Sequence, residues 1–137
     1  MFAQGSGHLT VGASPKVIGK RNDAVTARIP LNVDAGYHVN SDKPPSEYLI
    51  PLKLTWTATG ALQGGEVTFP KPSLLTVGDQ KLTVFTGSFD LLAKFKVAPT
   101  APAGPGVVTG KLRYQACNDT TCFPPKTVDV TVGYQVQ

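Results

Sequence analysis

The chain of 137 residues has only two cysteines, one methionine and one tryptophan. It has no long apolar run, because no stretch approaches the roughly 18 residues that a membrane-spanning helix requires. It also has no Ala/Glu/Leu-rich stretch of helical period, whereas 14 glycines and 12 prolines are spread along its length. We therefore expect no direct membrane insertion by these residues, and helices are disfavoured as the main element.

Charge is sparse and evenly distributed. Charged residues make up 16% of the chain and the formal net charge is +4. The 13 lysines and arginines are scattered, with only Lys20 and Arg21 adjacent. A nucleic-acid platform needs a basic stripe or aromatic residues interleaved with arginine, and the sequence has neither. Nucleic acid is therefore not an expected partner.

The sequence also lacks the residue sets that metal and hydrolytic chemistry use. A structural zinc site needs four Cys or His ligands at characteristic spacing, but only His8 and His38 accompany the cysteines and both lie far upstream. The chain has no G-x-S-x-G motif, and the stretch ATGALQGG is too irregular for a phosphate-binding loop. We expect no metal and no cofactor.

Alternation of apolar and polar residues is the dominant positive pattern. From Val25 to Val33 every second residue is apolar, as in a strand with one buried face. Seven to nine short strands are predicted, including runs at Leu52–Trp56, Glu66–Phe69, Leu82–Phe85, Phe89–Val97, Val107–Ala116 and Thr127–Val136. Turn residues separate these runs. The sequence therefore predicts an all-β fold, an immunoglobulin-like antiparallel β-sandwich.

The organisation along the chain indicates one domain, residues 1–137. The proline-rich stretch 98–106 resembles a linker, but the roughly thirty residues after it are too few for a second core, so a long surface loop is expected. The apolar phase changes across residues 86–88, which predicts a turn or bulge. Residues 1–7 are expected to be a flexible remnant of a removed secretory signal, which would place the protein outside the cytoplasm.

The stretch YQACNDTTCFPP contains both cysteines, Cys117 and Cys122, separated by four turn-forming residues. The chain can reverse there, so a disulfide between them is geometrically easy. A bridge that closes so short a loop contributes only about 2 kcal/mol to stability. The same bridge on an exposed turn suits a dithiol carrier, because each thiol can resolve a mixed disulfide made by the other. Spacing alone does not choose between a structural bridge and a redox pair.

Three segments carry a resemblance to a known family. The stretch YQACNDTTCFPPKTVDVTV resembles the active-site hairpin of the N-terminal periplasmic domain of the thiol:disulfide interchange protein DsbD. The upstream stretches AGYHVNSDKPPSEYLIPLKLTW and FPKPSLLTVGDQKLTVFTGSFDL resemble other parts of that family, and the similarity covers most of the chain from Val25 onward.

The resemblance implies an immunoglobulin-like, monomeric, periplasmic domain that acts as a protein-disulfide reductase component without a cofactor. Its implied partners are thioredoxin-like: a donor domain, and acceptors such as periplasmic disulfide isomerases or cytochrome-maturation thioredoxins. Carried over to this chain, Cys122 forms the mixed disulfide with partners and Cys117 resolves it. Position supports these roles, because Cys117 ends an apolar strand while Cys122 stands beyond a polar turn.

Further residues are candidates for lining the site, namely Tyr37, Leu74, Leu75, Tyr114, Phe123 and Pro124. The family covers its sulfurs with a loop that bears an aromatic residue and neighbouring acids. The aromatic and the acidic pair are absent from the matching stretch, residues 72–80, where Asp79 is the only acid. Leu74 and Leu75 are apolar lids or core residues, and Gly78 is a candidate hinge. Tyr37 and Phe123 are equally compatible with core packing.

Two interpretations fall outside this main hypothesis. His38 is given no role, because strand alternation turns it away from the face of its neighbour Tyr37 and nothing in the spacing requires it. The alternative for the whole chain is a secreted β-sandwich binding or adhesion module, whose disulfide merely pins a hairpin. Resistance of the bridge to reduction would indicate this alternative.

Overall fold

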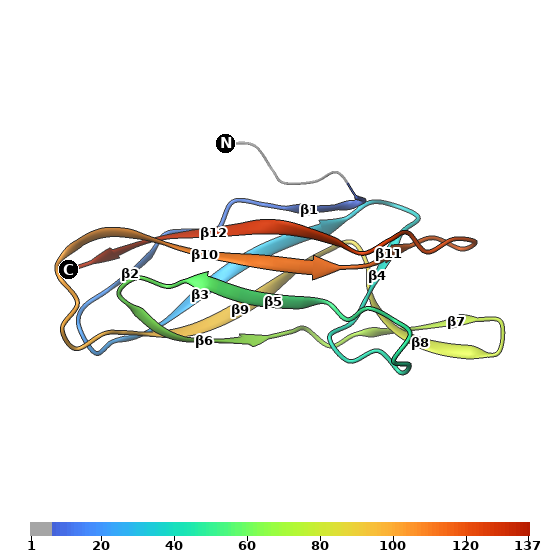
Figure 1. Ribbon diagram of the computed structural model, residues 1–137, viewed down its shortest axis with the longest axis horizontal. Coiled ribbons are helices and arrows are strands. Elements are labelled where there is room, and N and C mark those ends of the chain that lie inside the picture. Colours follow the sequence, from blue (N-terminus) through green and yellow to red (C-terminus); the bar gives the residue numbers. More distant parts are fainter. Residues whose placement is uncertain (1–6) are drawn as a thin grey trace.

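The computed structural model describes residues 7–137, and within that range every regular element is a β-strand (Figure 1). The first sheet has the order β1 (Leu9–Val11), β3 (Ala24–Val33), β9 (Ser88–Val97) and β6 (Leu62–Thr68). The second sheet has the order β2 (Val17–Gly19), β12 (Lys126–Val136), β10 (Gly104–Tyr114) and β5 (Lys53–Ala58). No helix in this part of the chain is long and apolar enough to cross a membrane.

The strand order confirms the predicted immunoglobulin-like sandwich. This fold has two packed antiparallel sheets, and here each sheet has four strands. The N-terminal segment contributes β1 to the first sheet and β2 to the second. Neighbouring strands are antiparallel except β2, which runs parallel to β12. The predicted all-β architecture is thus confirmed for the described residues.

The core lies between these two sheets. In β9 every second residue from Leu91 to Val97 is buried, which is the period that a strand with one core-facing side requires. The inward residues of β10 and β12 supply the opposite wall, with Val108, Leu112, Val130 and Val132 almost fully buried. The structure therefore has a core that does not depend on the cysteines, since neither belongs to this set of strands.

The structure differs from the predicted strand pattern in a few places. The short strands β1 and β2 were not predicted, because three residues are too few to show a period. The expected surface loop at 98–106 ends earlier, since β10 already begins at Gly104. The phase change at residues 86–88 is a bend between β8 and β9, in which Gly87 has φ 64°. Residues 1–6 of the predicted signal remnant lie outside the described residues, and Gly7 is buried.

A third, smaller sheet lies at one end of the sandwich, away from the C-terminus (Figure 1). Its order is β11 (Ala116–Cys117), β4 (His38–Asn40), β8 (Gln80–Phe85) and β7 (Ser73–Val77). Strand β11 continues from β10 of the second sheet, and β8 leads into β9 of the first. This end sheet therefore joins both layers. It carries residues that can take part in chemistry, including Cys117 on β11 and His38 on β4.

Candidate functional site

The two cysteines form a disulfide at the tip of the segment between β10 and β12. Their Cα atoms are 4.0 Å apart, and residues 117 and 122 also form an isolated antiparallel bridge. The two residues differ sharply in exposure, because Cys117 is only 2% exposed whereas Cys122 is exposed. The strand-and-turn pattern predicted this difference, and it means that another protein can reach only one of the two sulfurs directly.

The turn between the cysteines has its own hydrogen bonds. The backbone N–H of Asn118 donates to the carbonyl of Thr121 at 2.8 Å. The side-chain oxygen of Asn118 accepts from the backbone N–H groups of Thr120 at 2.9 Å and Thr121 at 2.7 Å. This is the local pattern that makes asparagine a turn former. The turn is therefore held by contacts that do not involve sulfur.

The base of the hairpin is anchored by Gln115. Its side-chain oxygen accepts hydrogen bonds from the side chain of Asn40 at 3.1 Å and the backbone N–H of Ile50 at 3.2 Å. Its side-chain nitrogen donates to the carbonyl of Phe123 at 3.4 Å, and the backbone N–H of Phe123 donates to Ala116 at 2.9 Å. These bonds join both arms of the hairpin to β4 and to the loop after it, which fixes the direction in which the disulfide points.

His38, Cys117 and Cys122 form one row across three neighbouring segments. Cys117 is the register partner of His38 in the β4–β11 pair, and of Cys122 in the bridge on the other side. Directly opposite residues of antiparallel segments project from the same face, with Cβ atoms about 4.5–5.5 Å apart. Cys117 therefore lies between the exposed sulfur on one side and an imidazole on the other.

Sequence reasoning set His38 aside and missed this row. The alternation of side chains along a strand puts His38 and Tyr37 on opposite faces. This alternation does not show which residue of the neighbouring strand lies opposite His38. His38 is 5% exposed, and burial lowers its pKa below the ordinary value; the carboxylate of Asp119 opposes this effect more weakly. The ring is consequently neutral at pH 7, and able to accept a proton.

An aromatic cluster flanks the hairpin on the other side. The rings of His8 and Tyr37 stack at a centroid distance of 3.8 Å and an interplanar angle of 6°. The ring of Phe123 lies 5.2 Å from His8 and 6.1 Å from Tyr37. His8 is also held by Asp34, whose carboxylate is 3.3 Å from its Nδ1. The structure thus brings the predicted Tyr37 and Phe123 together, and adds His8, which has no distinguishing signal in the sequence.

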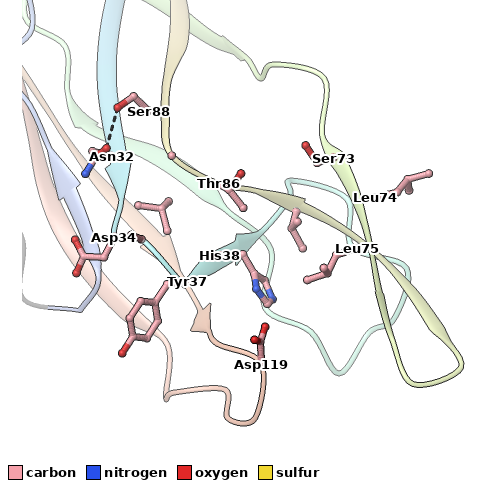
Figure 2. A pocket seen from close by; sticks show the side chains of 15 residues that line it. Asn32, Asp34, Tyr37, His38, Ser73, Leu74, Leu75, Thr86, Ser88 and Asp119 are labelled. Carbon is pink, nitrogen blue, oxygen red and sulfur yellow. Dashed lines mark hydrogen bonds between the residues drawn. The ribbon is translucent and has the colours of Figure 1, made fainter.

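A groove of about 690 Å³ opens beside the end sheet (Figure 2). Tyr37, His38 and Asp119 line it from the hairpin side, and Leu74 and Leu75 line it from β7. Figure 2 shows the side chains of His38, Leu75 and Asp119 among those that face this space. Two of the predicted lid residues therefore share a groove with Tyr37, although neither sulfur lines it.

The stretch 72–80 is not a loop but the first strand of a hairpin. Residues Ser73–Val77 form β7 and pair with β8, and Gly78 has φ 60° in the two-residue turn between them. A glycine adopts this backbone conformation without steric cost, so Gly78 serves the turn. Leu74 is 75% exposed and Leu75 is partly buried. The leucines therefore sit on a β-hairpin, and Leu74 does not belong to the core.

Tyr114 and Pro124 line a smaller pocket of about 260 Å³ together with Phe123. Tyr114 is buried, and its hydroxyl has no hydrogen-bond partner among the described residues. Burial raises the pKa of this hydroxyl, and the carboxylate of Asp34 adds to the effect. Pro124 is exposed next to the aromatic cluster. Tyr114 is thus a packing residue under the hairpin, whereas Pro124 belongs to its surface.

Within residues 7–137, no three His, Cys, Asp or Glu side chains gather as a metal site requires. The chemistry that the site offers lies in its sulfurs and in the polar groups around them. A short-range disulfide with one exposed and one buried sulfur, on a turn braced by independent hydrogen bonds, can open and close with little change in the scaffold. Fold and site together define an immunoglobulin-like domain that presents a thiol pair.

Comparison with protein families identifies this class more closely. The family described as thiol:disulfide interchange protein DsbD, N-terminal, matches residues 11–133, and the chain belongs to that family. Membership implies a role in thiol-disulfide interchange. No curated protein is similar enough in sequence to match the chain.

One of the matching solved structures shows the same fold at low sequence identity. The N-terminal periplasmic domain of ScsB from Proteus mirabilis superposes with a TM-score of 0.65 at 14% identity, over 92% of this chain and 45% of that one. This chain therefore spans less than half of that ScsB domain. The reduced N-terminal domain of DsbD from Neisseria meningitidis has a TM-score of 0.47 at 20% identity, over 90% of both chains.

Proposed function

We propose that the chain is a periplasmic thiol-disulfide exchange domain, which passes reducing equivalents from a thioredoxin-like donor to partner disulfide proteins through Cys117 and Cys122. The observation that carries this proposal is the unequal exposure of the two sulfurs on a braced turn. A carrier needs one sulfur that partners can attack and a second that is held close to it. Family membership supports the same chemistry.

The exchange proceeds in two displacements. In the reduced domain, the Cys122 thiolate attacks one sulfur of the partner's disulfide, so that a mixed disulfide forms and the partner's other sulfur leaves as a thiolate. Cys117 then attacks Cys122, which forms the Cys117–Cys122 bond and releases the second partner sulfur as a thiolate. Two electrons move to the partner. A thioredoxin-like dithiol restores the reduced domain by the reverse route.

The aromatic cluster of His8, Tyr37 and Phe123 lies beside the hairpin, and the exposed side chain of Leu74 lines the same groove as Tyr37. They supply the contact surface for a thioredoxin-fold partner in this proposal. Apolar and aromatic side chains with polar tips are the residues that transient interfaces favour. A periplasmic location is consistent with the ScsB domain of the same fold, which is described as periplasmic.

Trapping of mixed disulfides tests the proposal. The Cys117→Ser variant should accumulate more covalent adduct with an oxidised thioredoxin-like protein than the wild type does, because Cys117 is no longer present to resolve the bond at Cys122 and only the partner's own second thiol can reverse it. The Cys122→Ser variant should trap little, because Cys117 is buried. Adducts are counted on non-reducing gels. Equal trapping by both variants would contradict the roles. A wild-type bridge that no thioredoxin-like protein reduces while the domain is folded would indicate the structural alternative.

A further inference from the structure

We infer that His38 accepts the proton of Cys117 when Cys117 attacks the mixed disulfide at Cys122. This inference deepens the proposed function, because it concerns the resolving step of the same thiol pair. The proposed roles leave one problem unsolved. Cys117 must become a thiolate to attack, and a thiol buried among apolar groups ionises less readily than one in water.

The strand register places a base next to Cys117. His38 and Cys117 are directly opposite in the β4–β11 pair, and Cys122 is opposite Cys117 on the other side. The three side chains therefore share one face, in the order imidazole, buried sulfur, exposed sulfur. This is the order that an activated nucleophile requires, with a base beside it on one side and the bond to be attacked on the other.

His38 is also available for the task. Within residues 7–137 its ring makes no hydrogen bond, so no protein group competes for its lone pair. Asp119 from the turn is the carboxylate that acts on it, while Asp34 and Tyr37 line the same groove farther along the β3–β4 connection. From β7 and β8 the groove receives Leu75 and Val84, which carry no charge. Burial lowers the pKa of His38, which keeps the imidazole neutral before the step.

The step balances as follows. The neutral imidazole takes the proton from the Cys117 thiol, and the sulfur attacks Cys122. The Cys117–Cys122 bond forms while the bond between Cys122 and the partner breaks, and the partner sulfur leaves with the electron pair. The imidazolium then gives its proton to water through the groove. Asp119, which favours the charged ring, stabilises the imidazolium while it exists.

The resolving step can be observed without a protein partner. The fully reduced chain is mixed with dithio-bis-nitrobenzoate, an aromatic disulfide whose thiolate product is coloured. The first product molecule reports attack by Cys122, and the second reports resolution by Cys117. Rapid mixing at a series of pH values gives a rate for each phase. The first phase serves as an internal control, because His38 has no part in it.

In the wild type, the second phase should be flat above the pKa of His38 and should slow below it, where the ring is already protonated. In His38→Gln, it should be at least tenfold slower at pH 7, because an unassisted thiol is only about 3% thiolate there. The variant should then recover by about tenfold per pH unit as Cys117 ionises by itself. A role limited to packing would slow the phase equally at all pH values and would overturn the inference.

Two further variants test the inference independently of His38→Gln, in case that substitution at a buried position prevents folding. Asp119→Asn, at an exposed position, should move the low-pH inflection of the second phase to lower pH, because it removes the carboxylate that favours the charged ring. An unmoved inflection would contradict the inference. Glu66→Gln removes an exposed carboxylate on β6 that does not line the groove, and it should leave the pH profile of this phase unchanged. Because the probe replaces the partner, failure here is distinguishable from failure of the trapping experiment.

Discussion

At the scale of single residues, the site depends on unequal environments for two chemically identical side chains. Cys117 is the last residue of a buried strand, and Cys122 follows a polar turn. Asn118 also shapes the site, because its side chain accepts two hydrogen bonds that close the turn without involving sulfur. We therefore expect the hydrogen bonds of the turn to keep the two thiols close together in the reduced protein.

Asn118→Ala should make the disulfide easier to reduce. The variant loses the turn bonds at Thr120 and Thr121, with a net contribution of about 1 kcal/mol, so the reduced thiols separate more often. We expect the equilibrium constant for disulfide formation against glutathione to fall about fivefold. Asn118→Asp retains the acceptor oxygen and should stay near the wild type. An equilibrium constant for Asn118→Ala equal to that of the wild type would show that the turn does not hold the thiols together.

At the scale of elements, the end sheet positions everything that the site uses. It brings β4, β7, β8 and β11 together at one end of the sandwich, so that the hairpin of β7 and β8 faces the groove beside the disulfide turn (Figure 1). Leu74 on β7 is highly exposed although it is large and apolar. An exposed leucine alone is unremarkable for a protein surface. Its position beside the groove makes it a candidate for partner contact.

Leu74→Asp should slow exchange with a thioredoxin-like protein about tenfold, because the contact would then bury a charge. The rate of reduction by dithiothreitol should not change, since a small thiol needs only Cys122. Val107→Asp is the matched control: Val107 is also exposed, but it lies on β10 toward the end near the C-terminus and should affect neither rate. Stopped-flow kinetics with both reductants measure the two rates. Equal slowing by Leu74→Asp and Val107→Asp would remove β7 from the interface.

At the scale of the whole molecule, stability and reactivity reside in different places. The main core lies between the two four-stranded sheets, and the disulfide closes only a short loop at one end. A domain of this length buries enough surface to fold on its core alone. The bridge can therefore be opened and closed repeatedly without unfolding the carrier.

The reduced protein should accordingly remain folded. Closing a loop of about six residues contributes roughly 2 kcal/mol, against a total stability of about 5–15 kcal/mol for a typical domain. Reduction should lower the melting temperature by about 6–10 °C and leave a single cooperative transition. Calorimetry with and without a phosphine reductant measures this shift. Complete unfolding on reduction would instead show that the bridge is a structural staple.

Many strands of this protein can be predicted from the sequence, because the local period of apolar residues indicates which side chains are buried. The alternation from Val25 to Val33 predicts β3, and the strand and turn on either side of the cysteines predict their unequal exposure. The resemblance matches residues 72–80 to a loop of the family, whereas Ser73–Val77 form β7, because a matched position does not report the strand pairing of this chain. Periodicity needs several residues, so strands of two or three residues such as β11 leave no signal.

The sequence by itself determined the class of fold, the short spacing of the two sulfurs and the family to which the chain belongs. Only the tertiary structure decided that His38 stands opposite Cys117, that His8 stacks on Tyr37, and that β7 shares a groove with the disulfide turn. The physical reason is that alternation assigns a side chain to a face of its own strand, whereas its neighbours across the sheet depend on register. Register follows from how the whole core packs, and no local pattern contains it.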